Sequence, residues 1–228
     1  MSAQEREGLA AVEARIARAA AACGRDARSV KLVAVSKTKP SEAIRAAYAA
    51  GQRAFGESYA QELVTKRGEL ADLAEIEWHF IGHLQTNKAK LGAKAAVVVH
   101  AVDSVVLARE LGKRVLSAER RAPVPVLIEV NLAAEPQKHG TAPSELAEVI
   151  AAVERERGLA LRGLMTMPPF GNPEVARRTF GALASLRSLH GGESVLPELS
   201  MGMSGDLEIA IACGATIVRV GTAIFGER

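Results

Sequence analysis

The sequence predicts a (β/α)8 TIM barrel, on the basis of three observations. Eight apolar runs of strand length alternate with seven helical segments along the 228 residues. Strand-like runs such as 95–99 lack polar alternation, as expected when both faces of a parallel strand are covered. Alanine is abundant while aromatic residues make up 4% of the chain, a composition that suits helices packed closely on a sheet. An open doubly wound sheet is the alternative, because the same alternation serves both folds.

The elements follow from the hydrophobic pattern in chain order. In a leading helix over 1–23, Leu9, Val12 and Ile16 recur at helical spacing, and Gly24 follows as a stop. The predicted strands are 31–37, 53–58, 77–82, 95–102, 124–132, 159–167, 199–203 and 216–225. The predicted helices between them are 42–50, 59–70, 85–91, 104–121, 144–157, 173–189 and 207–213. The leading helix can fill the helical position left after the eighth strand, so we expect a single barrel domain over 1–228 with an extra N-terminal helix.

Composition and charge exclude several classes of protein. The net charge of +3 is spread along the chain, without the basic block that follows a phosphate backbone. The first 23 residues interleave charges with alanines and offer neither a signal peptide nor a membrane span. Cys23 and Cys213 lie far apart in apolar surroundings, which predicts two reduced, buried thiols. We therefore expect a cytoplasmic protein that binds neither nucleic acid nor membranes.

The first predicted strand carries a lysine to its end. Val33, Val35 and Lys37 share one face under the two-residue period of a strand, so Lys37 continues a row of buried side chains. Loss of hydration lowers the pKa of a lysine amine and raises the fraction able to attack a carbonyl, as a Schiff base requires. The alternative is that Lys37 is a solvated charge that opens the loop before Pro40, since lysine is almost never fully buried unless paired.

Two short stretches near the C-terminus have the composition of an anion site. Ser200 and Ser204 lie with two glycines directly before a predicted helix, and Gly221 and Thr222 follow the eighth strand in another turn of small residues. Helix N-termini favour phosphate, and the loops after strands seven and eight are the usual phosphate site of this barrel. A plain helix cap explains Ser204 equally well when its motif is considered alone.

Arg219 precedes the last of these turns by two residues and shares a strand face with Gly221, so we expect it to point into the barrel mouth. A guanidinium there must be paired. The ring nitrogen of a pyridine cofactor is one possible partner, and Glu129 is the alternative. A lysine for an aldehyde, a phosphate cradle and an inward arginine together describe a site for pyridoxal 5′-phosphate (PLP).

Other motifs point to no metal centre. His79 and His83 are four residues apart, but the strand-like run between them does not bring both onto one ion. We expect core or loop histidines there, and we expect Met203 and the other methionines near strand ends to pack. The sequence also lacks a Gly-x-Gly-x-x-Gly motif and a Walker lysine loop.

Motifs spread from the first strand to the last residues match one known family. They are Leu32 to Pro40, Phe55-Gly56-Glu57, Trp78 to Lys88, Glu129-Val130-Asn131 with Lys138 and Gly140, Gly163 to Met167, Leu199 to Asp206 and Arg219 to Gly226. In these motifs the sequence resembles the pyridoxal phosphate homeostasis proteins (YggS/PROSC type), which are related in fold to the barrel domain of bacterial alanine racemase. The resemblance implies a barrel of the PLP fold type III kind.

The resemblance also implies roles for individual residues. Lys37 would carry PLP as a Schiff base, and Arg219 would face the pyridine nitrogen. Ser200, Ser204, Gly221 and Thr222 would surround the phosphate. Ser58, His79 and Met203 are further predicted cofactor contacts, although Ser58 replaces the asparagine that is usual in the family and offers no amide donor. Lys138 occupies the position of a loop lysine associated with passing on the cofactor.

The expected function is PLP homeostasis, meaning storage, protection and delivery of PLP to PLP-dependent apoenzymes, without established turnover. A small barrel without a dimerisation domain is expected to be a monomer. The alternative is a PLP-dependent amino-acid racemase of fold type III with weak or narrow activity. A racemase needs an acid–base group on each face of the cofactor, and of the two tyrosines, Tyr48 and Tyr59, only Tyr59 is a conceivable partner for Lys37. A phosphosugar enzyme could use the same phosphate loops, but it needs no neutral lysine unless it is an aldolase.

Overall fold

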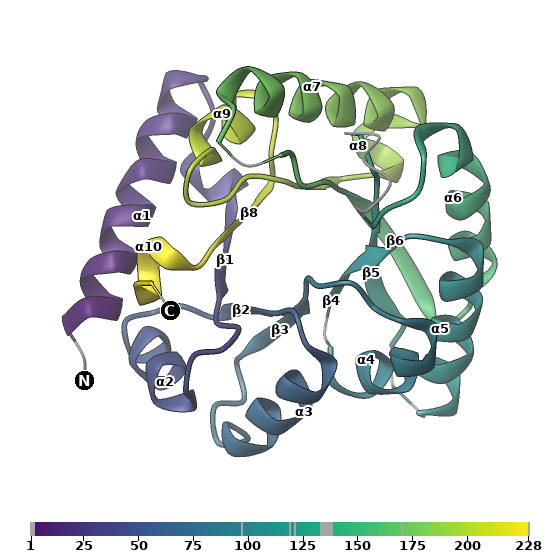
Figure 1. The fold of residues 1–228 in the computed structure, drawn as a ribbon, viewed down its shortest axis with the longest axis horizontal. Helices are drawn as coiled ribbons and strands as arrows, with labels where there is room; N and C mark the ends of the chain where they lie inside the picture. The colour runs from purple at the N-terminus through teal and green to yellow at the C-terminus, as the bar shows by residue number, and fades with distance from the viewer. Residues whose placement is uncertain are drawn as a thin grey trace.

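Eight parallel strands close into a barrel in the computed structural model of the chain (Figure 1). The described residues are 3–96, 98–118, 120, 122–132, 139–169 and 171–227. The strands are β1 Lys31–Val35, β2 Ala54–Glu57, β3 Glu77–Phe80, β4 Val98–Val102, β5 Val124–Glu129, β6 Leu159–Met165, β7 Glu198–Ser200 and β8 Ile217–Val220. They follow one another in sequence order, and β1 pairs with β8. The predicted closed barrel is therefore confirmed, and the open sheet is wrong.

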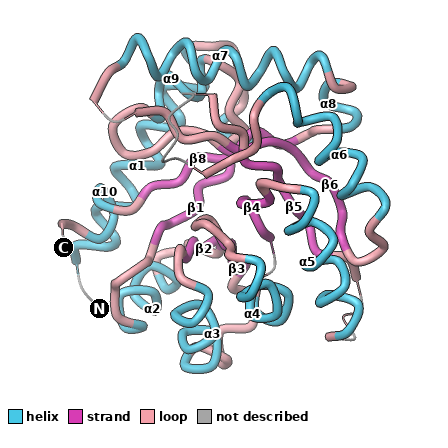
Figure 2. Tube along the Cα trace, turned by 45° about the vertical axis from the view of Figure 1, so that its right-hand side comes forward, coloured by secondary structure: helices cyan, strands magenta, loops and turns pink. Residues whose placement is uncertain are grey.

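Helices surround the barrel, with the strands at the centre of the molecule (Figure 2). They are α1 Ala3–Ala22, α2 Ser41–Ala49, α3 Ala60–Glu69, α4 Ala89–Ala95, α5 Val105–Ser117, α6 Leu146–Arg155, α7 Pro173–Leu189, α8 Gly192–Val195, α9 Leu207–Ala212 and α10 Thr222–Phe225, with 3-10 turns at Ala27–Ser29, Thr86–Lys88 and Pro143–Glu145. Among the described residues, no helix is long and apolar enough to cross a membrane.

The leading helix α1 fills the position after β8, as predicted. It packs against α2, α9 and α10 (Figure 1). Leu9, Val12 and Ile16 form its buried face. The approach to α10 is close, because a Cβ on Gly8 would lie 2.7 Å from the Ile224 carbonyl oxygen. Only glycine therefore fits at this point of the contact.

Several predicted elements differ in detail. Most of the predicted strands extend too far at their C-terminal ends, and β1 ends at Val35, two residues before Lys37. The predicted strand 216–225 ends at Val220, and residues 222–225 form α10 instead. The helix predicted at 85–91 becomes a 3-10 turn followed by α4, so the next strand begins at Val98. Both cysteines are free, but Cys23 is exposed and Cys213 is half-buried, so their predicted burial is wrong.

The barrel interior has an apolar layer and a polar one. The apolar layer consists of Val33, Ala54, Val98, Leu127, Met165 and Ile217. Two residues further along β4, β5 and β8, the buried side chains are polar, namely His100, Glu129 and Arg219. His79 of β3 and Ser200 of β7 are also polar and buried. Because barrel interiors are normally filled by branched apolar side chains, these polar groups mark the end of the barrel where a site is built.

Candidate functional site

A cavity of about 290 Å³ opens at the carboxyl ends of β1 and β8. Six of the predicted cofactor contacts line it, namely Lys37, Met203, Ser204, Arg219, Gly221 and Thr222. They come from positions 37, 203–204 and 219–222, which are far apart in sequence and are brought together by the pairing of β8 with β1. The volume lies close to the lower end of the ~300–1,000 Å³ range of small-molecule sites.

Lys37 lies in the turn that follows β1. The prediction that it continues the strand is wrong, because the strand ends at Val35 and Lys37 is half-buried rather than fully buried. The turn bends sharply at Thr38, which has a φ of 64°, a left-handed conformation that is uncommon for a β-branched residue. The turn directs the chain so that Lys37 still reaches the cavity.

A buried polar network fixes the backbone on both sides of Lys37. The Ser36 hydroxyl donates to Glu57 Oε1 at 2.7 Å, and Lys66 Nζ donates to the Ser36 carbonyl at 2.7 Å. Lys66 also pairs with Glu57 at 2.8 Å and with Glu62 at 2.7 Å. Glu62 in turn accepts a hydrogen bond from the Thr38 N–H at 2.6 Å. Burial raises the pKa of Glu57, while Lys66 and Ser36 oppose that rise.

Lys66 was not anticipated from the sequence, although a signal was present. It lies at 5% exposure on α3, between the buried Leu63 and Leu70. The three residues follow helical spacing, so Lys66 occupies a position where an apolar side chain is expected. A lysine on the buried face of a helix needs carboxylate partners, and Glu62 lies one turn earlier.

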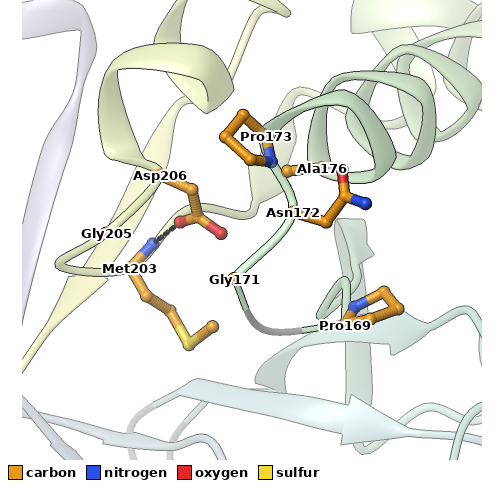
Figure 3. A pocket seen from close by; sticks show the side chains of 8 residues that line it. All are labelled: Pro169, Gly171, Asn172, Pro173, Ala176, Met203, Gly205 and Asp206. Atoms are coloured by element: carbon orange, nitrogen blue, oxygen red, sulfur yellow. Dashed lines mark hydrogen bonds between the residues drawn. The ribbon is translucent and has the colours of Figure 1, made fainter.

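The loop after β7 forms a wall of the cavity. The Met203 N–H donates to Asp206 Oδ1 at 2.6 Å (Figure 3). Burial raises the pKa of Asp206, while this hydrogen bond from Met203 lowers it. From the outside, Arg15 of α1 donates to the Ser204 carbonyl at 2.9 Å. Met203 and Gly205 also line a neighbouring cavity of about 220 Å³, so the loop separates two cavities.

The turn after β8 lies directly against the end of β1. A Cβ on Gly221 would lie 3.1 Å from the Val35 carbonyl oxygen, so the two backbones approach closely. Lys39 Nζ donates to the carbonyls of Phe225 and Gly226 at 3.0 and 3.1 Å. These contacts hold α10 and the turn that carries Lys37 side by side. The Lys37 amine therefore lies on the same side of the barrel as the turn of Gly221 and Thr222.

Arg219 is buried at the base of the cavity. Its Nη1 donates to Ser200 Oγ at 2.5 Å, and its Nη2 donates to the Thr166 carbonyl at 3.1 Å. Burial lowers its pKa to about 10, while the charges of Glu129 and Asp206 raise it. Arg219 is therefore a cation at neutral pH, and its predicted alternative partner, Glu129, acts on it through charge.

Three predicted contacts do not line this cavity. Ser200 is fully buried, and its hydroxyl lies between Arg219 and His100. His79 is fully buried inside the barrel. Ser58 lines a different cavity of about 470 Å³, on the β3 side of the mouth. Lys138 lies outside the described residues.

Glu129 makes the stability of the folded chain depend on pH. Burial raises its pKa to about 7 from an ordinary 4.5, Asp103 adds to the rise, and Arg219 opposes it. The folded state therefore binds this proton more tightly than the unfolded state, and the resulting stability is full below pH 4.5 and is lost as the pH rises towards 7. On raising the pH from 5 to 8, Glu129→Gln should gain about 2 kcal/mol of unfolding free energy relative to the parent chain.

Denaturant titrations at the two pH values measure this difference. The exposed Glu148→Gln on α6 is the matched control and should show no such change. An equal response of the two variants would refute the assignment of the titration to Glu129.

A second polar group lies across the mouth. His83 stacks on His139 at a ring distance of 3.5 Å, and its Nδ1 lies 3.3 Å from Asp103 Oδ2. The possible ligand atoms of these three residues lie within 4.8 Å of one another. The rings are nearly parallel, at 7°, so their nitrogen lone pairs lie in two separate parallel planes and do not converge on one ion. We assign no metal to this group.

The residues of the main cavity fit PLP. The cavity offers an amine from Lys37, hydroxyls from Ser204 and Thr222, and a buried guanidinium from Arg219. This set suits a small ring that carries an aldehyde, a phosphate and an acceptor nitrogen. When bound, PLP would supply the aldehyde and the phosphate, and the protein supplies the groups that bind and orient them.

The fold and the site define a barrel of the alanine racemase N-terminal domain class. The model of that family, described as "Alanine racemase, N-terminal domain", matches residues 8–228. The chain is 47% identical over 226 residues to the "Pyridoxal phosphate homeostasis protein" of Pseudomonas aeruginosa, covering 97% of this chain and 95% of the relative. It is 43% identical over 227 residues to the protein of the same name from Escherichia coli, covering 96% and 95%. The chain therefore belongs to the family of pyridoxal phosphate homeostasis proteins.

Solved structures agree with this assignment. PipY of Synechococcus elongatus, solved with PLP bound, is 35% identical, with a TM-score of 0.85 over 98% of this chain and 100% of its own. Alanine racemase from Corynebacterium glutamicum gives a TM-score of 0.70 at 18% identity, over 98% of this chain and 62% of its own. The likeness to the racemase shows the fold alone.

Proposed function

We propose that this chain binds PLP in the cavity at the mouth of the barrel, holds it as a Schiff base on Lys37, and acts in PLP homeostasis. One observation carries the proposal: a single cavity is lined by the amine of Lys37, by Ser204 and the Gly221–Thr222 turn, and by the Arg219 guanidinium. The phosphate would lie at Ser204, Gly221 and Thr222. The names of the relatives and the PLP bound to PipY support this choice of ligand.

The remaining predicted contacts take different roles in this proposal. Ser200 would act on the cofactor through Arg219, because its hydroxyl is buried and already bonded. Met203 would pack against the cofactor from the loop after β7. Ser58 and His79 would make no direct contact with PLP. The role of Lys138 as the loop lysine that passes the cofactor on remains a prediction.

We further propose that the chain works as a single, cytoplasmic, monomeric barrel domain whose partners are PLP-dependent apoenzymes. The experiment mixes the PLP-loaded protein with the apo form of a PLP-dependent enzyme in the presence of a phosphatase that destroys free PLP. Delivery predicts recovery of the apoenzyme's activity under conditions in which an equal amount of free PLP gives none. Recovery no better than with free PLP would contradict delivery.

Racemisation is the alternative. Among the described residues, neither tyrosine lines the cavity of Lys37: Tyr48 donates to Glu75 on the outer surface, and Tyr59 is 57% exposed beside the other cavity with Ser58. A racemase must exchange the α-proton of its substrate. We therefore expect no deuterium at the α-carbon of any common amino acid after incubation with the PLP-loaded protein in heavy water, and incorporation would reinstate the racemase.

A further inference from the structure

A line of buried polar side chains crosses the barrel interior beneath the cavity. Arg219 Nη1 lies 2.5 Å from Ser200 Oγ, His100 Nδ1 lies 2.9 Å from the same oxygen, and His100 Nε2 lies 2.8 Å from His79 Nδ1. The exposed fraction of these four residues is 3% or less. Polar groups buried so completely are tolerated only when they are hydrogen-bonded, so each contact matters to the barrel.

The direction of every hydrogen bond in this line follows from its first member and from the need of each buried polar proton for an acceptor. A guanidinium only donates, so Ser200 Oγ accepts from Arg219. His100 Nδ1 is the other hydrogen-bond partner of this hydroxyl among the described residues, so the buried Ser200 proton is satisfied when it goes to His100 Nδ1. A neutral imidazole carries one proton, so His100 bears it on Nε2 and donates to His79 Nδ1. His79 must then carry its proton on Nε2. One tautomer is thereby assigned to each ring.

The line ends at a carboxylate on the opposite end of the barrel. His79 Nε2 lies 3.2 Å from Glu77 Oε1, a close contact whose alignment falls short of a hydrogen bond. Glu77 also pairs with Lys31 at 2.8 Å. The contact with His79, together with Lys31, lowers the pKa of Glu77 to about 2, so it stays ionised. A cation lies at one end of the line and an anion at the other.

Burial inside the barrel favours the neutral form of both rings. Burial lowers the pKa of His79, and it lowers that of His100 well below its ordinary value. The charged groups that act on the two rings are Glu77, Lys31, Glu198 and Arg219. The neutral forms are those that the one-way direction of the hydrogen bonds requires.

We propose that Ser200, His100 and His79 are positioning residues that hold Arg219 in the orientation it presents to the cavity. The guanidinium has five N–H donors. Ser200 and the Thr166 carbonyl each take one of them, on different nitrogens, which prevents the group from rotating and leaves the others for the cavity. The proposal rests on the proposed function, because it takes Arg219 to contact the ring nitrogen of PLP.

The first test needs no cofactor. Nitrogen NMR of the full chain labelled with 15N-histidine reports which ring nitrogen carries the proton, with His79→Gln and His100→Gln used for assignment. We expect both rings to be protonated on Nε2 alone at pH 8. A proton on Nδ1 of either ring at this pH would overturn the proposal.

The second test compares two replacements of His100 by the absorbance titration of each variant with PLP. The amide oxygen of His100→Asn can accept from Ser200 in place of Nδ1, whereas His100→Gln reaches towards His79 and leaves Ser200 without its acceptor. We expect roughly tenfold weaker PLP binding for His100→Gln, and nearly unchanged binding for His100→Asn. Equal effects in the two variants, or none, would refute a positioning role.

The two proposals fail separately. If the parent chain forms no Schiff base with PLP, the proposed function fails, and the NMR tautomers still decide whether the line of hydrogen bonds exists. If His100→Gln does not fold, Ser200→Ala takes its place in the titration, with the same weakening expected, since it removes the acceptor of Arg219 Nη1.

Discussion

Lys37→Ala is expected to abolish the covalent attachment of PLP while the barrel stays folded. Lys37 is half-buried in a turn, and Lys66 and Glu62 hold that turn through the backbone of Ser36 and Thr38. The loss of the Lys37 side chain therefore removes the amine and little of the packing. Titration with PLP should give no visible absorbance band of a lysine-bound cofactor, and thermal unfolding should change little.

The exposed Lys113→Ala on α5 is the matched control, because it removes one lysine far from the mouth. It should give the same band as the parent chain. A band of full intensity in Lys37→Ala would contradict the assignment of the Schiff base to this residue.

Lys66→Met should be the most destabilising of the substitutions considered. Lys66 is 5% exposed and pairs with Glu57, which is fully buried. Removing one partner of a buried pair leaves the other charge uncompensated and costs about 3–5 kcal/mol of unfolding free energy. Urea titrations at neutral pH measure the loss. The exposed Lys90→Met on α4 should change the free energy of unfolding by less than about 0.5 kcal/mol.

Adding Glu57→Gln to Lys66→Met should recover part of the loss, because it removes the uncompensated charge. The two residues contact each other, so their effects should not add. A loss below about 1 kcal/mol in Lys66→Met, or no recovery in the double variant, would contradict the idea that this pair organises the turn that carries Lys37.

Much of the barrel could be predicted from the sequence, because its pattern is local. Eight apolar runs alternate with amphipathic helices, and each run marks a strand of the closed barrel. The ends of the strands are harder to predict from the sequence. Lys37 and Ser58 each follow an apolar run after one polar residue, Ser36 or Glu57, and both strands end before them. Strand ends depend on where the neighbouring strands stop offering partners, and this information is not local.

The last strand shows the same limit. Residues 216–225 are mostly apolar, which favours one long strand, but β8 ends at Val220. Gly221 lies against the Val35 carbonyl, and the chain then turns into α10. The small residues that predicted a phosphate turn were the better guide to the local conformation than hydrophobicity.

The polar partners inside the barrel could not be paired from the sequence. His100 lies in an otherwise apolar run, and its partner Ser200 is 100 residues away. Ser200 could be recognised as a site residue by its motif, but its hydroxyl supports Arg219 instead of facing the cavity. Such roles depend on which strand faces which across the barrel, so they emerge only from the closed fold.

The measurement that tests the central claim most directly is the mass of the peptide that carries Lys37 after incubation with PLP and reduction with borohydride. Reduction converts a Schiff base into a stable secondary amine, so the cofactor stays on the lysine that held it. We predict that one pyridoxyl phosphate group is found on Lys37 and that other lysine peptides keep their unmodified mass. A label on another lysine, or no label at all, would contradict the account.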